Sequence, residues 1–83
     1  MKVTVKYFAS IRELVGTGSE TIETHAATVA ALRDELIARG GPYAEALARG
    51  KAVRVAFNQT LSDETAAVTE GAEVAFFPPV TGG

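Results

Sequence analysis

The sequence predicts one small α+β domain in which a mixed β-sheet packs on one main helix. The 83 residues are 47% apolar, which suits an ordered single-domain protein near the lower size limit for one hydrophobic core. Several segments alternate apolar and polar residues, as strands do, and one central segment repeats at helical spacing. The resulting order, β-β-α-β-β, provides a helical crossover long enough for two strands to pair in parallel. One helix covers one sheet face, so the other must meet solvent or a partner.

The first two strands flank a short predicted helix. Residues 2–9 alternate, and the inward face carries Val3, Val5 and Tyr7. Ser10 and Glu13 have the spacing of a capping box, which predicts a short helix that ends at Gly16. Residues 18–24 are rich in Thr and Glu, which favours a weaker strand at an edge of the sheet.

The main helix is predicted over residues 28–39. Thr28 is a suitable N-cap residue, and an apolar stripe follows at helical spacing through Val29, Leu32, Leu36 and Ile37. Gly40 and Gly41 end this helix, and Pro42 suits the first turn of another short one.

Two turns organise the C-terminal half. Residues 52–58 form a third predicted strand, and Asn58 and Gln59 turn the chain into a short strand near Leu61. Glu70 and Gly71 precede the last strand, residues 72–77. Phe57 should share the inward face of the third strand. The predicted core contains Val3, Val5, Val29, Leu32, Leu36, Val53, Val55, Val74 and Phe76.

Strand parity places two phenylalanines on the outward face of the sheet. Phe8 shares the parity of Lys6 on the first strand, and Phe77 shares that of Glu73 on the last. An outward aromatic pair on neighbouring strands favours a docking surface, with Leu61 as a third candidate. The alternative is that both rings sit at strand ends and curl over the edge of the core.

The end of the chain has an unusual composition. The last strand runs into Pro78 and Pro79, which favour an extended conformation, and then into residues 80–83, Val80, Thr81, Gly82 and Gly83. We therefore expect a domain over residues 1–77 and a projecting tail over residues 78–83, with a reach of roughly 20 Å at ~3.3–3.6 Å per residue. Glycines fit narrow slots, and the Gly83 carboxylate is inert until another protein activates it. The simpler alternative is a frayed terminus.

Composition excludes several classes of function. A net charge of −2 with scattered Lys and Arg disfavours binding to nucleic acid or an anionic membrane; Arg49, Lys51 and Arg54 form the only loose basic group. No secretory signal or membrane span is evident, so we expect a cytoplasmic protein.

Side chains that would form an active site are also missing. There is no cysteine, and His25 is alone, so we expect no bound metal. The acidic pairs, Glu20 with Glu23 and Asp63 with Glu64, are interpreted as solvated surface. The chemistry is therefore expected at Gly83, under the control of other proteins.

Four segments together resemble the molybdopterin synthase small subunit, the sulfur-carrier family of molybdenum cofactor biosynthesis. They occur in the family's order and spacing and are residues 8–16 (FASIRELVG), 28–33 (TVAALR), 58–61 (NQTL) and 75–83 (AFFPPVTGG). The C-terminal segment is the most specific. Phe57, where many members carry Val, and the turn Glu70-Gly71-Ala72 depart mildly from the family pattern.

The resemblance implies the β-grasp fold and a carrier role without catalysis of its own. An activating enzyme would use ATP to adenylate Gly83, and an outside sulfur donor would convert it to a thiocarboxylate. The tail would then enter the large subunit of the synthase, in an expected heterotetramer, and give its sulfur to a cyclic pterin precursor. Residues 77–83, Phe8 and Leu61 would make the contacts. Two alternatives remain open: a carrier of the thiamin type, and a ubiquitin-like modifier or binding module.

Overall fold

The computed structural model describes residues 1–79; residues 80–83 lie outside it. The described chain forms five strands and three helices. In chain order they are β1 (Lys2–Tyr7), α1 (Ala9–Val15), β2 (Ser19–Glu23), α2 (Val29–Ile37), α3 (Gly41–Leu47), β3 (Arg54–Phe57), β4 (Thr60–Ser62) and β5 (Glu73–Phe77). None of the helices in this part of the chain is long and apolar enough to cross a membrane.

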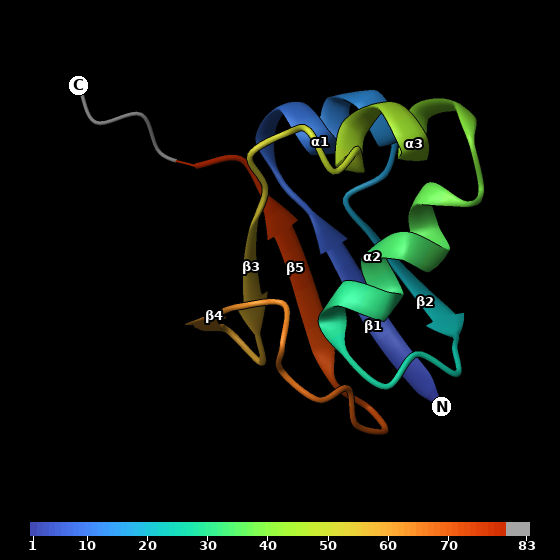
Figure 1. Cartoon of the computed structure of the whole chain (residues 1–83), viewed down its shortest axis with the longest axis vertical. Helices are drawn as coiled ribbons and strands as arrows, with labels where there is room; N and C mark the ends of the chain where they lie inside the picture. The colour runs from blue at the N-terminus through green and yellow to red at the C-terminus, as the bar shows by residue number, and fades with distance from the viewer. Residues whose placement is uncertain (80–83) are drawn as a thin grey trace.

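The strands form one mixed sheet in the order β2-β1-β5-β3-β4. The central strands β1 and β5, from opposite ends of the sequence, pair in parallel, and the other three pairings are antiparallel. Figure 1 shows α2 lying across one face of the sheet, with α1 and α3 together at one end. The predicted mixed sheet is confirmed, and β2 is an edge strand as expected.

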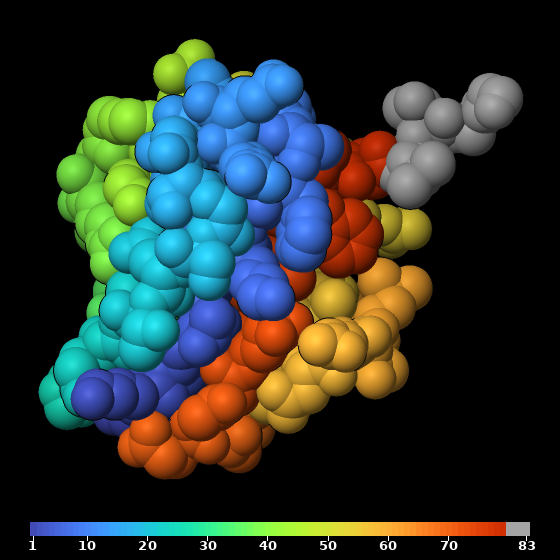
Figure 2. Space-filling view, turned by 180° about the vertical axis from the view of Figure 1, so that it is seen from behind, coloured from blue at the N-terminus to red at the C-terminus, as the bar shows by residue number. Residues whose placement is uncertain are grey.

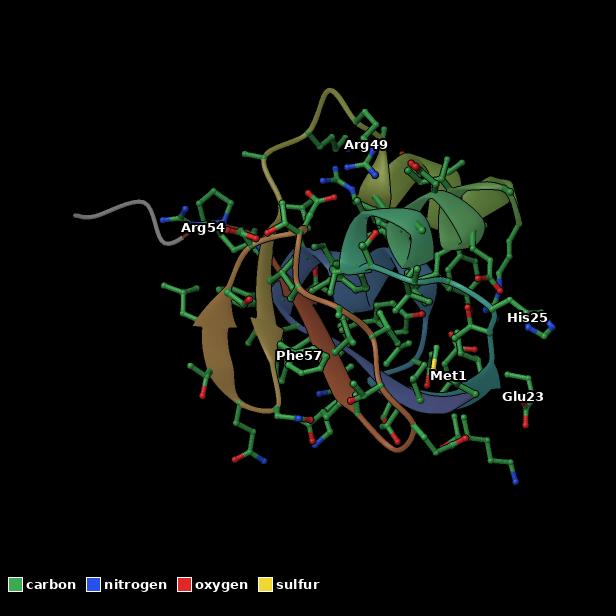
Figure 3. The ribbon with its side chains drawn as sticks, turned by 60° about the horizontal axis from the view of Figure 1, so that its bottom comes forward. Met1, Glu23, His25, Arg49, Arg54 and Phe57 are labelled. Carbon is green, nitrogen blue, oxygen red and sulfur yellow. The ribbon has the colours of Figure 1, made fainter. Side chains whose placement is uncertain are left out.

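The core lies between α2 and the inner face of the sheet. Leu32 and Leu36 on α2 are fully buried against strand residues such as Val5 and Phe76. Eight of the nine predicted core residues are buried; Val53 is the exception and is partly buried against the same cluster. Phe57 also packs partly on the core, and in Figure 3 its ring points toward the interior. The alternation of the strands therefore predicted the inner face correctly.

Two helix starts show where local signals succeed and fail. The Thr28 side chain accepts a hydrogen bond from the Ala31 N–H at 3.2 Å, so the predicted N-cap of α2 is confirmed. The predicted capping box of α1 is wrong, because Phe8 is the N-cap residue and Ser10 lies inside the helix. The Phe8 N–H donates to the Phe76 carbonyl at 3.2 Å, which holds Phe8 extended at the end of β1. The N-cap of helix α1 therefore lies two residues earlier than the capping-box pattern indicates, at Phe8 and not at Ser10.

Candidate functional site: the open face of the sheet

The outer face of the sheet carries an apolar row. Strand register aligns Lys6, Ala75, Ala56 and Leu61 across β1, β5, β3 and β4. Three of these four neighbours are apolar, and Leu61 is 66% exposed. Figure 2, seen from behind, shows these strands uncovered by α2. The predicted open face is therefore present in the described chain.

A second row at the end of the sheet contains the two outward phenylalanines. Phe77 pairs with Arg54 of β3, and Phe8 follows the end of β1, beside β5. Phe8 is 46% exposed, whereas Phe77 is partly buried. Because nearly half of Phe8 stays exposed, the alternative that its ring curls over the core is wrong for this residue. Phe77 is partly buried, but it is not among the residues that pack on the core cluster.

The tail leaves the domain at this same end. Pro78 and Pro79 directly follow Phe77 and are partly buried. The predicted tail residues Val80, Thr81, Gly82 and Gly83 lie outside the described residues. The described base of the tail thus leaves β5 at the end of the sheet where Phe8 ends the neighbouring strand.

A tight hairpin places Leu61 on the open face. Asn58 and Gln59 both have positive φ, 49° and 69°, the combination that a two-residue hairpin of type I′ requires. Asn tolerates this conformation better than most residues. The Asn58 side-chain oxygen also accepts the Glu73 N–H at 2.9 Å, and the Asn58 N–H donates to the Glu73 carbonyl at 2.8 Å. The hairpin is thereby tied to β5, which fixes Leu61 relative to Phe77.

Some charged side chains on the open face form ion pairs and others do not. Lys6 forms an ion pair with Glu73 at 3.5 Å. Arg54 is exposed and has no ion-pair or hydrogen-bond partner for its side chain within residues 1–79. Lys2, at the opposite end of the same face, likewise has no ion-pair partner among those residues. The end beside the tail therefore combines exposed apolar area with one unpaired cation.

Glu20 corrects the prediction that the acidic residues are merely solvated. Its carboxylate accepts hydrogen bonds from the hydroxyls of Tyr7 and Tyr43, both at 2.8 Å, and from Arg39 at 3.0 Å. Burial of Glu20 opposes its ionisation, but the hydrogen bonds outweigh burial and lower its pKa below the usual value. Burial is the first cause that raises the pKa of Tyr7 well above its usual value, and the bond to Glu20 adds to it. This cluster ties β2 to α3 and the core, and it is structural.

The prediction that Glu64 is solvated surface is also wrong. Glu64 accepts hydrogen bonds from Arg49 and, at 2.8 Å, from Arg33. Arg33 is 3% exposed and also donates to the carbonyls of Leu47 and Ala48 at 2.8 Å. The buried guanidinium thus holds the segment between α3 and β3 in place. Arg49 belongs to this network, so the loose basic group is not one free cationic patch.

The remaining polar candidates form no site in the described chain. His25 is exposed, and Figure 3 shows it pointing away from the domain. Residues 1–79 contain no group of three or more His, Asp or Glu arranged to hold a metal ion, and they enclose no pocket. The candidate site is therefore a surface, composed of Phe8, Phe77, Leu61 and the base of the tail.

Comparison with known proteins relates this chain to sulfur carriers. A model of the ThiS family matches residues 5–83. The molybdopterin synthase sulfur carrier subunit of Haemophilus influenzae is 48% identical over 79 residues, which cover 95% of this chain and 96% of that protein. The subunit of the same name from Escherichia coli is 47% identical over 81 residues, or 98% and 99% of the two chains.

Solved structures share the fold over nearly the full length. A Pyrococcus furiosus protein assigned as molybdopterin converting factor subunit 1 has a TM-score of 0.77 at 31% identity and covers 96% of this chain and 99% of that one. SAMP1 of Haloferax volcanii has a TM-score of 0.77 at 26% identity with full coverage of both chains. A complex of subunits 1 and 2 of molybdopterin-converting factor from Helicobacter pylori has a TM-score of 0.69 at 26% identity, again with full coverage. These likenesses confirm the ubiquitin-like β-grasp fold.

Proposed function

Since this chain belongs to the family of molybdopterin synthase sulfur carrier subunits, within the wider ThiS family, we propose that it carries sulfur in molybdenum cofactor biosynthesis. The observation that carries this proposal is the 48% identity to a named sulfur carrier subunit across 95% of the chain. The reactive group is the Gly83 carboxylate, and no side chain of this protein takes part in bond making.

The proposed chemistry has two activation steps and one transfer. A Gly83 carboxylate oxygen attacks the α-phosphorus of ATP on an activating enzyme, and pyrophosphate leaves. A donor that delivers sulfur at the oxidation level of sulfide attacks the acyl carbon, AMP leaves, and the terminus becomes a thiocarboxylate. The thiocarboxylate sulfur then bonds to a carbon of the cyclic pterin precursor in place of an oxygen substituent, and water cleaves the bond between this sulfur and the Gly83 acyl carbon, which restores the carboxylate. Two sulfurs complete one dithiolene, so two carriers are used for each product.

The open face provides the means of docking in this scheme. Phe77 directly precedes the base of the tail, Phe8 ends the neighbouring strand, and Leu61 is exposed on the same face of the sheet. Aromatic residues are enriched at protein interfaces. Pro78 and Pro79 restrict the backbone where the tail leaves β5, which lowers the entropy lost when the tail enters a partner. Gly82 and Gly83 would fit a channel too narrow for a side chain.

The proposed partners are the large subunit of molybdopterin synthase and the activating enzyme. The Helicobacter pylori structure pairs subunit 1 with subunit 2 of the converting factor, which supports a large-subunit partner for this chain. We infer a heterotetramer, with two carriers on a dimer of large subunits. ATP is bound by the activating enzyme and not by this chain, and the steps take place in the cytoplasm, where ATP is available.

A second candidate function is protein modification. The small archaeal modifier protein 1 of Haloferax volcanii superposes with a TM-score of 0.75 at 25% identity. In that role the Gly83 acyl group would form an isopeptide bond to a lysine of a target protein, with loss of AMP from the adenylate.

Mass spectrometry of the protein from its own cells distinguishes the two functions. A carrier should appear with one oxygen replaced by sulfur at its C-terminus, whereas a modifier should appear in covalent conjugates much heavier than the free chain. Thiocarboxylated protein, the large subunit and the pterin precursor together should then yield molybdopterin. Formation of conjugates without thiocarboxylate would overturn the carrier proposal.

A further inference from the structure

The Arg54 side chain, on the open face, has no ion-pair or hydrogen-bond partner within residues 1–79. Arg54 begins β3 and lies directly across from Phe77, the last residue of β5. Its neighbour Val55 is buried, so parity puts Arg54 on the open face. Figure 3 shows Arg54 at the end of the sheet from which the chain continues beyond β5. Other arginines, such as Arg33 and Arg49, are paired with carboxylates, whereas Arg54 has no such partner within residues 1–79.

Docking through Phe77 would remove water from Arg54 as well. Directly opposed side chains on antiparallel strands have Cβ atoms about 4.5–5.5 Å apart, so a partner that covers one ring covers much of the neighbouring side chain. A guanidinium that loses water without gaining a partner is strongly unfavourable, whereas a carboxylate binds it with two parallel hydrogen bonds. The docking partner must therefore present an acceptor to Arg54.

We propose that Arg54 is a specificity-determining residue of the docking surface, where it pairs with a carboxylate on the body of the large subunit. This inference rests on the proposed function. It assigns to the partner an acidic residue next to the pocket that receives Phe77, and it makes the contact partly electrostatic as well as apolar.

The distance between Arg54 and the end of the tail indicates which group Arg54 binds. It favours a carboxylate on the body of the large subunit over a phosphate of the substrate near Gly83. A tail of six residues extends at most ~3.6 Å per residue, so an extended tail carries the Gly83 carbonyl roughly 20 Å beyond Phe77. Arg54 stays at the base of that tail, beside Phe77. A substrate phosphate near Gly83 is then beyond its reach, and Arg54 acts on binding and not on the chemical step.

The test compares Arg54→Gln, Arg54→Lys and the control Lys2→Gln in binding to the large subunit of the same organism. Lys2 is the matched control because it has the same charge, lies on the same face and is exposed at the far end of β1. Arg54→Gln should weaken binding about tenfold or more, equal to about 1.4 kcal/mol. Arg54→Lys keeps the charge but loses the two-pronged geometry, so it should lie between the parent and Arg54→Gln. Lys2→Gln should stay within about twofold of the parent.

The salt dependence of the affinity distinguishes a buried ion pair at Arg54 from long-range electrostatic attraction between the two proteins. Between ~0.15 M and ~1 M salt the screening length falls from about 8 Å to about 3 Å, and buried pairs are screened much less than exposed charges. The affinity ratio between Arg54→Gln and Lys2→Gln should therefore persist at high salt. The rate of sulfur transfer at saturating carrier should be the same for all three variants, and their unfolding midpoints should match the parent.

Three outcomes would overturn the inference. Equal losses for Arg54→Gln and Lys2→Gln would show non-specific charge attraction, and no loss for Arg54→Gln would show a solvated side chain. Unchanged affinity with slower sulfur transfer would place Arg54 at the tail or the substrate. If the parent binds and only the Arg54 result fails, the proposed function stands. If the parent itself does not bind the large subunit, the docking proposal and this inference fail together.

Discussion

Replacing Phe8 by Ala should weaken partner binding more than it weakens the fold. The Phe8 side chain is 46% exposed, so folding removes only about half of its surface from water. Full burial of a phenylalanine stabilises by about 1.5–3 kcal/mol, so Phe8→Ala should lower the free energy of unfolding by roughly 1–1.5 kcal/mol. No capping hydrogen bond is lost, because the side chain of this N-cap residue makes none. The exposed half is available to a partner, and its loss should lower affinity for the large subunit by at least ~1 kcal/mol.

Denaturant unfolding and calorimetric titration with the large subunit measure the two quantities on the same samples. Phe76→Ala is the matched control, because Phe76 is fully buried and should cost the fold about 3–5 kcal/mol. If Phe8→Ala costs as much folding stability as Phe76→Ala while affinity is unchanged, Phe8 belongs to the core and the reasoning is refuted.

Three further predictions concern the tail, the core and the Glu20 cluster. Deletion of Gly83 leaves a terminal carboxylate on Gly82 but shortens the reach of the tail by roughly 3.5 Å. Sulfur transfer in a coupled assay should therefore be abolished while the unfolding curve is unchanged. Retained transfer would refute the proposed role of the tail. Leu32→Ala should lower the free energy of unfolding by about 2–5 kcal/mol, and a loss under ~1 kcal/mol would contradict its place in the core. Because the folded-state pKa of Glu20 is lowered from 4.5, its stabilisation is complete at neutral pH and is lost as pH falls through that folded pKa. The stability difference between the parent and Glu20→Gln, measured by unfolding at several pH values, should therefore be largest near neutrality and shrink in acid; a constant difference would refute this.

Features that depend on neighbours along the chain were predictable from the order of residues. Period-two alternation placed Val3 and Val5 inside and Phe8 outside, since successive strand residues point to opposite faces whatever the strand pairs with. The N-cap at Thr28 was likewise predictable, because its bond reaches only three residues along the chain. The prediction that Gly83 is the reactive residue came from the motif of residues 75–83 and not from the fold.

Contacts between segments that are distant in the sequence became known from the three-dimensional structure alone. Glu20 gathers Tyr7, Arg39 and Tyr43 from 13, 19 and 23 residues away, and Glu64 meets Arg33 across 31. No local pattern encodes such partners, so these acids were misread as solvated. The capping box at Ser10 failed for the same reason, because the pairing of β1 with β5 carries the extended backbone through Phe8. The pairing of Arg54 with Phe77 also depends on the register between β3 and β5. This register is set when the apolar face of the sheet is buried, so the order of residues alone does not reveal it.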